Sequence, residues 1–234
     1  MDTSNGDEPI PPLGMPVVRP LVWVVAAVAA LGGLLFGFDT GVISGALLLI
    51  RDQFGLGATG QEVVVSAVLV GCILGAASAG RCTDRFGRKP VILVTAGVFC
   101  AGSLWAGLAG SVGHLVAARV VIGLGIGMAS FTVPLYISEI SPPRVRGALV
   151  SLNQLMITIG ILVSYFVDDI FAATDEGWRW MFLAGIVPAA VLAAGMAVLP
   201  RSPRWLFGAG REDEARSVLA RLEGPAAVDA RMAE

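Results

Sequence analysis

Six apolar blocks, each about 20 residues long, dominate the sequence between residues 21 and 199. An α-helix rises about 1.5 Å per residue, so a block of this length spans the roughly 30 Å hydrocarbon core of a bilayer. The predicted spans cover about 21–49, 62–80, 90–110, 115–137, 147–167 and 180–199. The connections are short, which makes neighbouring helices antiparallel. The sequence therefore predicts an all-α membrane protein with six transmembrane helices.

The composition supports a membrane location and excludes several kinds of function. Hydrophobic residues make up 56% of the 234 residues and charged residues 15%, against a usual charged share of about 25%. A net charge of −2 gives no positive excess for binding nucleic acid. Cys72, Cys82 and Cys100 lack the close spacing of a metal site, and His114 is the single histidine. We therefore expect no metal, no cofactor and no enzyme activity.

The positions of the basic residues predict the orientation of the spans. Thirteen of the sixteen Lys and Arg residues lie in the N-terminal segment, the second and fourth connections and the C-terminal segment. Only Arg51 and Arg179 lie on the other side, and Arg119 lies inside a span. Because Lys and Arg in short loops stay in the cytoplasm, both termini are predicted to be cytoplasmic. The predicted outer loops carry acidic residues instead, namely Asp52, Glu62, Asp168, Asp169, Asp175 and Glu176.

Both ends of the chain differ from the membrane region. Residues 1–20 are rich in proline and acidic residues, which predicts a disordered cytoplasmic tail. Residues 21–200 form the predicted six-helix transmembrane domain, and residues 201–234 a cytoplasmic helical segment. Within that segment, 211–223 has apolar residues at helical spacing among charges, which predicts a short amphipathic helix.

Two ionisable residues interrupt the apolar spans, Asp39 in the first and Arg119 in the fourth. Each would cost several kcal/mol if it faced lipid, so both should point inward and toward each other. Both lie in the outer half of the membrane. They are either a permanent structural ion pair or a proton relay. In a relay, Asp39 takes up a proton when Arg119 is drawn away.

Gln154 lies inside the fifth span, where its amide offers donors and an acceptor for a hydroxyl-rich solute. The alternative is a hydrogen bond to another helix. Gly123, Gly125 and Gly127 spell GxGxG, but no strand surrounds them. Small residues four positions apart, here and at Gly71 and Gly75, instead predict close helix packing.

The cytoplasmic connections are rich in charges of both signs. Asp84 lies among four cations in 80–89, and Glu139 lies close in sequence to Arg144 and Arg146. These charges either set the topology alone or form ion pairs that link helix ends in one conformation and separate in another.

Several segments together resemble the sugar porters of the major facilitator superfamily, over residues 32–207. They are GGLLFGFDTGVISGAL in the first span, GRCTDRFGRK after the second, PLYISEISPPRVRGALVSLNQLMITIG across the fourth and fifth, and GWRWMF and LPRSPRWL around the sixth. The resemblance covers the N-terminal half of that fold. It implies alternating access, with a sugar bound between two six-helix halves.

The resemblance also implies roles for individual residues. Asp39 matches the proton-binding acid of proton-coupled members and Arg119 its partner, which favours symport of a monosaccharide or polyol with protons. Gln154 matches the sugar-binding glutamine and Phe36 an aromatic residue lining the sugar site. Five residues match positions of the family's cytoplasmic ion-pair network: Arg85, Arg88, Glu139, Arg146 and Arg204. Together with Asp84 they form the predicted gate.

Two departures from the family pattern bear on these roles. Arg201 replaces the family's glutamate after the sixth helix, and Ile161 replaces a glutamine found in some members. The first predicts a weaker gate, and the second leaves the identity of the sugar open. The expected partners are a sugar or polyol, protons, the bilayer, and a C-terminal half or a second six-helix chain. The alternatives are an inert or helix-packing fragment and an uncoupled sugar facilitator.

Overall fold

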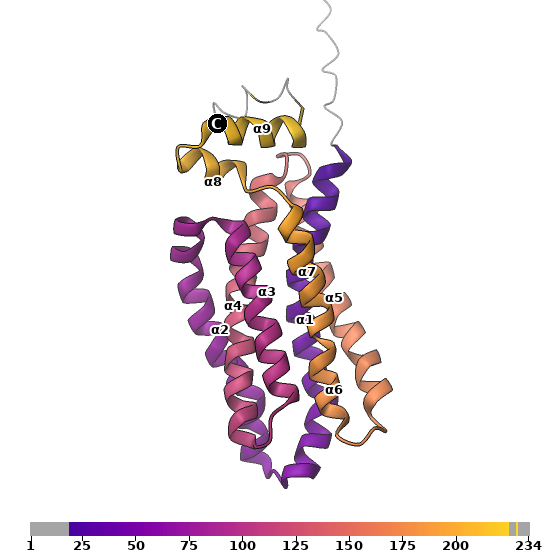
Figure 1. Ribbon diagram of the computed structural model, residues 1–234. Helices are drawn as coiled ribbons and strands as arrows, with labels where there is room; N and C mark the ends of the chain where they lie inside the picture. The colour runs from indigo at the N-terminus through magenta and orange to yellow at the C-terminus, as the bar shows by residue number, and fades with distance from the viewer. Residues whose placement is uncertain (1–18, 225–227, 229–234) are drawn as a thin grey trace, which may run out of the picture.

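The computed structural model describes residues 19–224 and residue 228. Within these residues the chain is a bundle of long helices with two short helices lying across one end (Figure 1). The helices are α1 (Pro20–Phe54), α2 (Ala58–Phe86), α3 (Arg88–Gly107), α4 (Val112–Ile140), α5 (Arg146–Phe171), α6 (Gly177–Ala184), α7 (Ile186–Val198), α8 (Pro203–Gly208) and α9 (Glu212–Leu222). The tail predicted to be disordered lies outside the described residues except for Arg19 and Pro20, and Pro20 begins α1.

Six helical stretches in the described part of the chain are long and apolar enough to cross a membrane. They coincide with the six predicted spans, but most of them extend several residues farther. Thus α2 continues to Phe86, and the predicted loop 80–89 is reduced to Gly87 between α2 and α3. Gly87 has φ of 89°, a conformation that a residue without Cβ adopts without strain. The helices extend because backbone groups near the membrane need hydrogen bonds even where the side chains are charged.

The sixth span consists of two helices, whereas the sequence predicted one continuous helix over 180–199. The span crosses from Gly177 to Val198, and the break falls at Gly185, between α6 and α7. Pro188 explains the break, because it has no N–H to donate to the carbonyl of Ala184 and its ring crowds that carbonyl.

Close packing at glycine joins the long helices in pairs; the glycine spacing predicted it at Gly71 and Gly123 but not between α1 and α5. Gly37 of α1 faces the backbone of α5 at Ile157, and Gly160 of α5 faces the backbone of α1. Gly71 of α2 and Gly123 of α4 face each other's helices in the same way. A side chain at any of these positions would overlap backbone atoms of the neighbouring helix. The pairs α1–α5 and α2–α4 are therefore in backbone contact, which small residues permit in membranes.

Asp168 does not lie in an outer loop as predicted, because α5 continues to Phe171. Its side chain is buried, and Oδ2 accepts a hydrogen bond from the backbone N–H of Gly45 at 3.2 Å. Gly45 leaves room for this carboxylate because it has no side chain. Glu62 and Asp52 also lie on helices, in α2 and α1, and not in loops.

The short helices α8 and α9 cover the end of the bundle where α1 begins and α7 ends (Figure 1). The amphipathic helix predicted over 211–223 is present as α9, which buries Ala215, Leu219 and Leu222. Arg19 donates hydrogen bonds to the carbonyls of Ala220 and Arg221, and so ties α9 to the start of α1. The preceding helix α8 was not predicted; the hydroxyl of Ser202 caps its N-terminus.

Candidate functional site

An ion pair joins α1 and α4 inside the bundle. Nη1 of Arg119 donates a hydrogen bond to Oδ1 of Asp39, and the two residues are only 1% and 3% exposed. This contact confirms that the two intramembrane charges point toward each other. Breaking a buried pair by removing one partner costs about 3–5 kcal/mol, because the other charge is left uncompensated.

A third residue, which the sequence did not indicate, completes the surroundings of this pair. The guanidinium carbon of Arg119 lies 5.8 Å from the centre of the Phe182 ring, over its face. Phe182 belongs to α6 and is 2% exposed. It is part of the GWRWMF motif, whose role in the sequence analysis was only to support the family resemblance.

The two predicted sugar ligands, Gln154 and Phe36, lie on α5 and α1. Gln154 is exposed on α5, and its side-chain amide forms no hydrogen bond with any described residue. The alternative, a bond from Gln154 to another helix, is therefore not seen in this part of the chain. Phe36 of α1 is half-buried and packs against the core.

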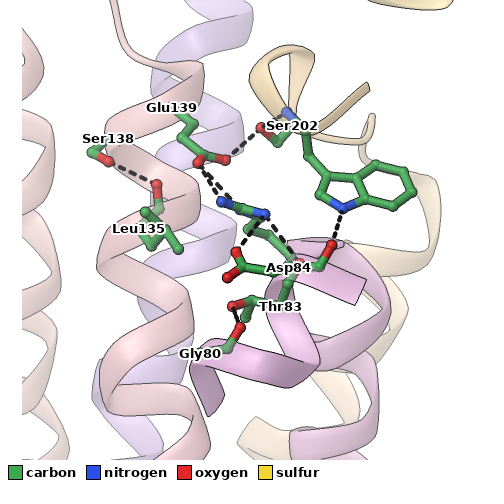
Figure 2. A network of polar contacts seen from close by, with 9 residues as sticks. Gly80, Thr83, Asp84, Leu135, Ser138, Glu139 and Ser202 are labelled. Atoms are coloured by element: carbon green, nitrogen blue, oxygen red, sulfur yellow. Dashed lines mark hydrogen bonds and ion pairs between the residues drawn. The ribbon is translucent and has the colours of Figure 1, made fainter. Parts of the chain in front are cut away.

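A second cluster of charges lies at the cytoplasmic ends of α2, α3 and α4 as the sequence assigns them. Glu139 of α4 forms an ion pair with Nη2 of Arg88 at 2.9 Å, and Oε1 also accepts from Nε at 3.1 Å. Ser202 donates its hydroxyl to Oε2 of Glu139 at 2.5 Å, and Asp84 pairs with Arg88 at 3.6 Å (Figure 2). The indole N–H of Trp205 donates to the carbonyl of Asp84 at 3.0 Å. The contacts form a closed ring through the α2–α3 turn, α4 and α8.

The cluster contains three of the six residues predicted for the gate. Asp84, Arg88 and Glu139 belong to it, whereas Arg85, Arg146 and Arg204 form no ion pair within the described residues. Glu139 pairs with Arg88, which is 51 residues away in the chain, and not with Arg146, whose Nε is buried without a partner among the described residues. The reason is that α4 ends at Ile140 and the chain turns before α5 begins at Arg146.

Side chains of α3 and α4 hold the segment between α7 and α8 in place, through contacts that the sequence did not indicate. Lys89 donates to the carbonyl of Leu199 at 2.6 Å, and the hydroxyl of Tyr136 donates to the carbonyl of Pro200 at 2.7 Å. Arg201, the residue that departs from the family pattern, lies 5.5 Å from the centre of the Trp205 ring. Its charge therefore faces an aromatic ring, where the family has a carboxylate.

At the opposite end of the bundle, polar contacts join α1, α3 and α6. Gln53 donates to Glu176 at 3.0 Å and accepts from the indole N–H of Trp178. Arg179 pairs with Glu176 at 3.0 Å and donates to the carbonyls at the end of α3. Glu176 has φ of 54°, so these contacts hold a non-glycine residue in the left-handed region. Among the described residues, no group of three or more His, Cys, Asp or Glu side chains is placed to hold a metal ion.

Membrane-crossing helices that enclose a charged pair are typical of membrane transporters, in which such residues mark ion or substrate pathways. Residues 25–234 match the model of the family "Sugar (and other) transporter". The chain belongs to this family, within the sugar porters of the major facilitator superfamily, and corresponds to the N-terminal half of their fold. It is therefore a multi-pass membrane protein.

Two sequence relatives and one solved structure show the extent of the similarity. The chain is 45% identical over 197 residues to the glucose transporter GlcP of Staphylococcus epidermidis, covering 84% of this chain and 44% of that protein. It is 44% identical over 209 residues to the galactose-proton symporter of Escherichia coli K12, covering 89% and 45%. The proton:xylose symporter XylE superposes with a TM-score of 0.84 at 32% identity, covering 91% and 52%; XylE is a protein of E. coli. The chain thus spans about half the length of these proteins.

Proposed function

We propose that the chain is the N-terminal half of a transporter that moves a monosaccharide or polyol together with protons by alternating access. Its family and the activities of its relatives, among them a galactose-proton symporter and a proton:xylose symporter, support this proposal. The buried pair of Asp39 and Arg119 is the observation that carries it. The protein would lie in the cell membrane with both termini in the cytoplasm.

The proposed coupling step takes place at Asp39. A proton that binds the carboxylate cancels its charge, and Arg119 loses its counter-charge. The link between α1 and α4 then weakens, because a neutral acid binds a guanidinium far less strongly than a carboxylate does. Coupling follows if this change in the link favours one of the two access states.

The proposed sugar ligands lie where a second half would close the site. Gln154 is exposed and its amide is unoccupied among the described residues, so it is available to sugar hydroxyls, which need hydrogen bonds when they are buried. Phe36 supplies an aromatic edge of the same site. The remaining ligands would come from a C-terminal half, or from a second six-helix chain.

The cytoplasmic cluster is the proposed gate in this half. Glu139 and Arg88 hold the end of α4 to the α2–α3 turn, and Ser202 brings in the segment before α8. Arg85, Arg146 and Arg204, also predicted for the gate, are not paired here within the described residues and would take part only in another conformation. The side chains of Glu139 and Arg88 are only 2% and 12% exposed, so this pair separates only when the same movement admits water or new partners to both charges.

The test is Asp39→Asn in a chimera that joins this chain to the C-terminal half of the E. coli galactose-proton symporter. Accumulation of labelled galactose, glucose, xylose and inositol is measured in vesicles with an imposed pH gradient, and sugar exchange without a gradient. We expect Asp39→Asn to abolish accumulation and to leave exchange. The matched control is Asp169→Asn, an exposed carboxylate of α5, which should keep both. Undiminished uphill uptake by Asp39→Asn would refute the coupling role.

The chain expressed alone addresses the alternatives. Uptake by the chain alone would favour assembly of two copies, and no uptake alone but uptake by the chimera supports a half-transporter. A chimera whose uptake does not change with pH would indicate an uncoupled facilitator. If neither form transports, the chain is an inert or helix-packing fragment.

A further inference from the structure

We propose that Phe182 is a positioning residue that holds Arg119 in place when Asp39 becomes protonated. This inference rests on the proposed function, and it assigns a task to a ring that lies on neither helix of the ion pair. Phe182 belongs to α6, whereas Asp39 and Arg119 belong to α1 and α4.

The guanidinium of Arg119 is incompletely satisfied by Asp39. It has five N–H donors, but its one hydrogen bond among the described residues is the bond from Nη1 to Asp39. Nε is buried without a partner. A buried cation with so few bonds depends on other favourable contacts. The face of Phe182, 5.8 Å from the guanidinium carbon, provides one, because the face of an aromatic ring attracts cations.

Neighbouring aromatic residues fix the Phe182 ring in its position. Trp178 is fully buried and meets Phe182 edge to face, with ring centres 6.4 Å apart and planes at 82°. On its other side Trp178 meets Phe54 at 6.0 Å, and its indole N–H donates to Gln53. A row of aromatic rings therefore leads from the outer end of α1 to Arg119. The ring that Arg119 faces is therefore in contact with a second, fully buried aromatic residue.

Among the described residues, Asp39 is the one carboxylate with which Arg119 forms an ion pair. Cys72 of α2 is an ionisable side chain that interacts electrostatically with both members of the pair. Asp168 of α5 bonds to Gly45, and Arg179 of α6 pairs with Glu176. Within the described residues α3 contributes no charge beyond Arg88 and Lys89 at its cytoplasmic start. When Asp39 is neutral, the ring is thus the remaining electrostatic contact of Arg119, and Arg119 stays in place while Asp39 is released.

The test compares Phe182→Leu, which removes the aromatic face, with Phe182→Tyr, which keeps it. Phe99→Leu is the matched control, since Phe99 is equally buried and forms no recorded contact with Arg119. Arg119 faces the ring in the paired state as well, so the ring affects protonation of Asp39 through the strength that this contact gains when Asp39 no longer neutralises the guanidinium. Without the ring that gain is lost, and protonation requires a lower pH. A desolvated cation–π contact corresponds to about a tenfold effect, which is a shift of about one pH unit.

Two measurements are made. In the chimera, the pH of half-maximal sugar accumulation should fall by about one unit in Phe182→Leu, and should stay near the unsubstituted value in Phe182→Tyr and Phe99→Leu. In the 234-residue chain itself, reconstituted in lipid, infrared spectroscopy follows the protonated carboxyl band that Asp39→Asn abolishes. The pH at which this band appears should shift in the same direction and by the same amount.

The outcomes separate this inference from the proposed function. If Asp39→Asn still accumulates sugar, the coupling proposal fails, while the infrared titration still reports on Phe182. An Asp39 band that appears at the same pH in Phe182→Leu as in the unsubstituted chain would overturn the positioning role. So would an equal shift in Phe99→Leu, because loss of packing alone would then explain the effect.

Discussion

Gly71→Ala tests whether backbone contact between α2 and α4 stabilises this half. A Cβ at Gly71 would lie 2.7 Å from the amide nitrogen of Leu124 and 2.9 Å from the Cα of Gly123, where ordinary contacts are 3.4–4 Å. The carbonyl oxygen of Val120 would lie closer still, and all three are backbone atoms, so the helices must separate by about an ångström. Overpacking of this kind costs about 1–3 kcal/mol, and helix propensity returns about 1 kcal/mol.

Gly80→Ala, in the same helix, is the matched control, because a Cβ there meets no atom within 4 Å. It should gain about 1 kcal/mol from propensity alone. The two variants should thus differ by about 1–3 kcal/mol in the free energy of unfolding. The measurement is unfolding of the purified chain in mixed micelles with increasing SDS, followed by far-ultraviolet circular dichroism.

The double variant Gly71→Ala/Gly123→Ala sharpens the test. Both methyl groups act at the same crossing, so the separation forced by one already makes room for the other. The combined loss should be smaller than the sum of the single losses, by about 0.5 kcal/mol or more. A Gly71→Ala variant as stable as Gly80→Ala would refute the reasoning, because the helices would then not depend on this close approach.

Two further predictions concern the polar contacts at the two ends of the bundle. Ser202→Ala removes the bond to Glu139 and the cap of α8. It should speed amide hydrogen exchange in 203–208 about tenfold or more, while Ser138→Ala, which loses only a bond within its own helix, should not. At the other end, Glu176→Ala loses the contacts to Gln53 and Arg179 but keeps the positive φ. Glu176→Gly relieves that strain and should be more stable than Glu176→Ala by about 1 kcal/mol in the same unfolding assay; equal stability would contradict a strained Glu176.

The spans and the buried pair were predictable because the bilayer imposes strict rules. Only a long apolar helix crosses the hydrocarbon, and an isolated charge inside it needs a partner. Asp39 and Arg119 were the two charges inside the predicted spans, so few pairings were possible. The break at Gly185 was not predictable with the same certainty, because membrane helices often continue through a proline such as Pro188.

The partners at the end of the bundle that α8 and α9 cover were harder to predict because several charges of each sign lie there. Glu139 lies close in sequence to Arg144 and Arg146, but its ion pair is with Arg88, which is 51 residues away in the chain. Ser202 contacts Glu139 through its hydroxyl group, and an uncharged hydroxyl does not stand out in a pattern of charged residues. Phe182 was missed for a related reason. An apolar residue in an apolar span gives no sign in the sequence that its ring contacts the cation of Arg119.

The packing gives the ion pair a particular place in this half. Glycines bring α1 into backbone contact with α5, and α2 into backbone contact with α4. Asp39 belongs to the first of these pairs and Arg119 to the second, so the ion pair joins two units that are themselves held by van der Waals contact between backbones. A proton on Asp39 changes the interaction between the units and leaves the packing within each unit as it was. A charge at this position can therefore alter the arrangement of helices at little cost to the stability of either unit, as the proposed coupling requires.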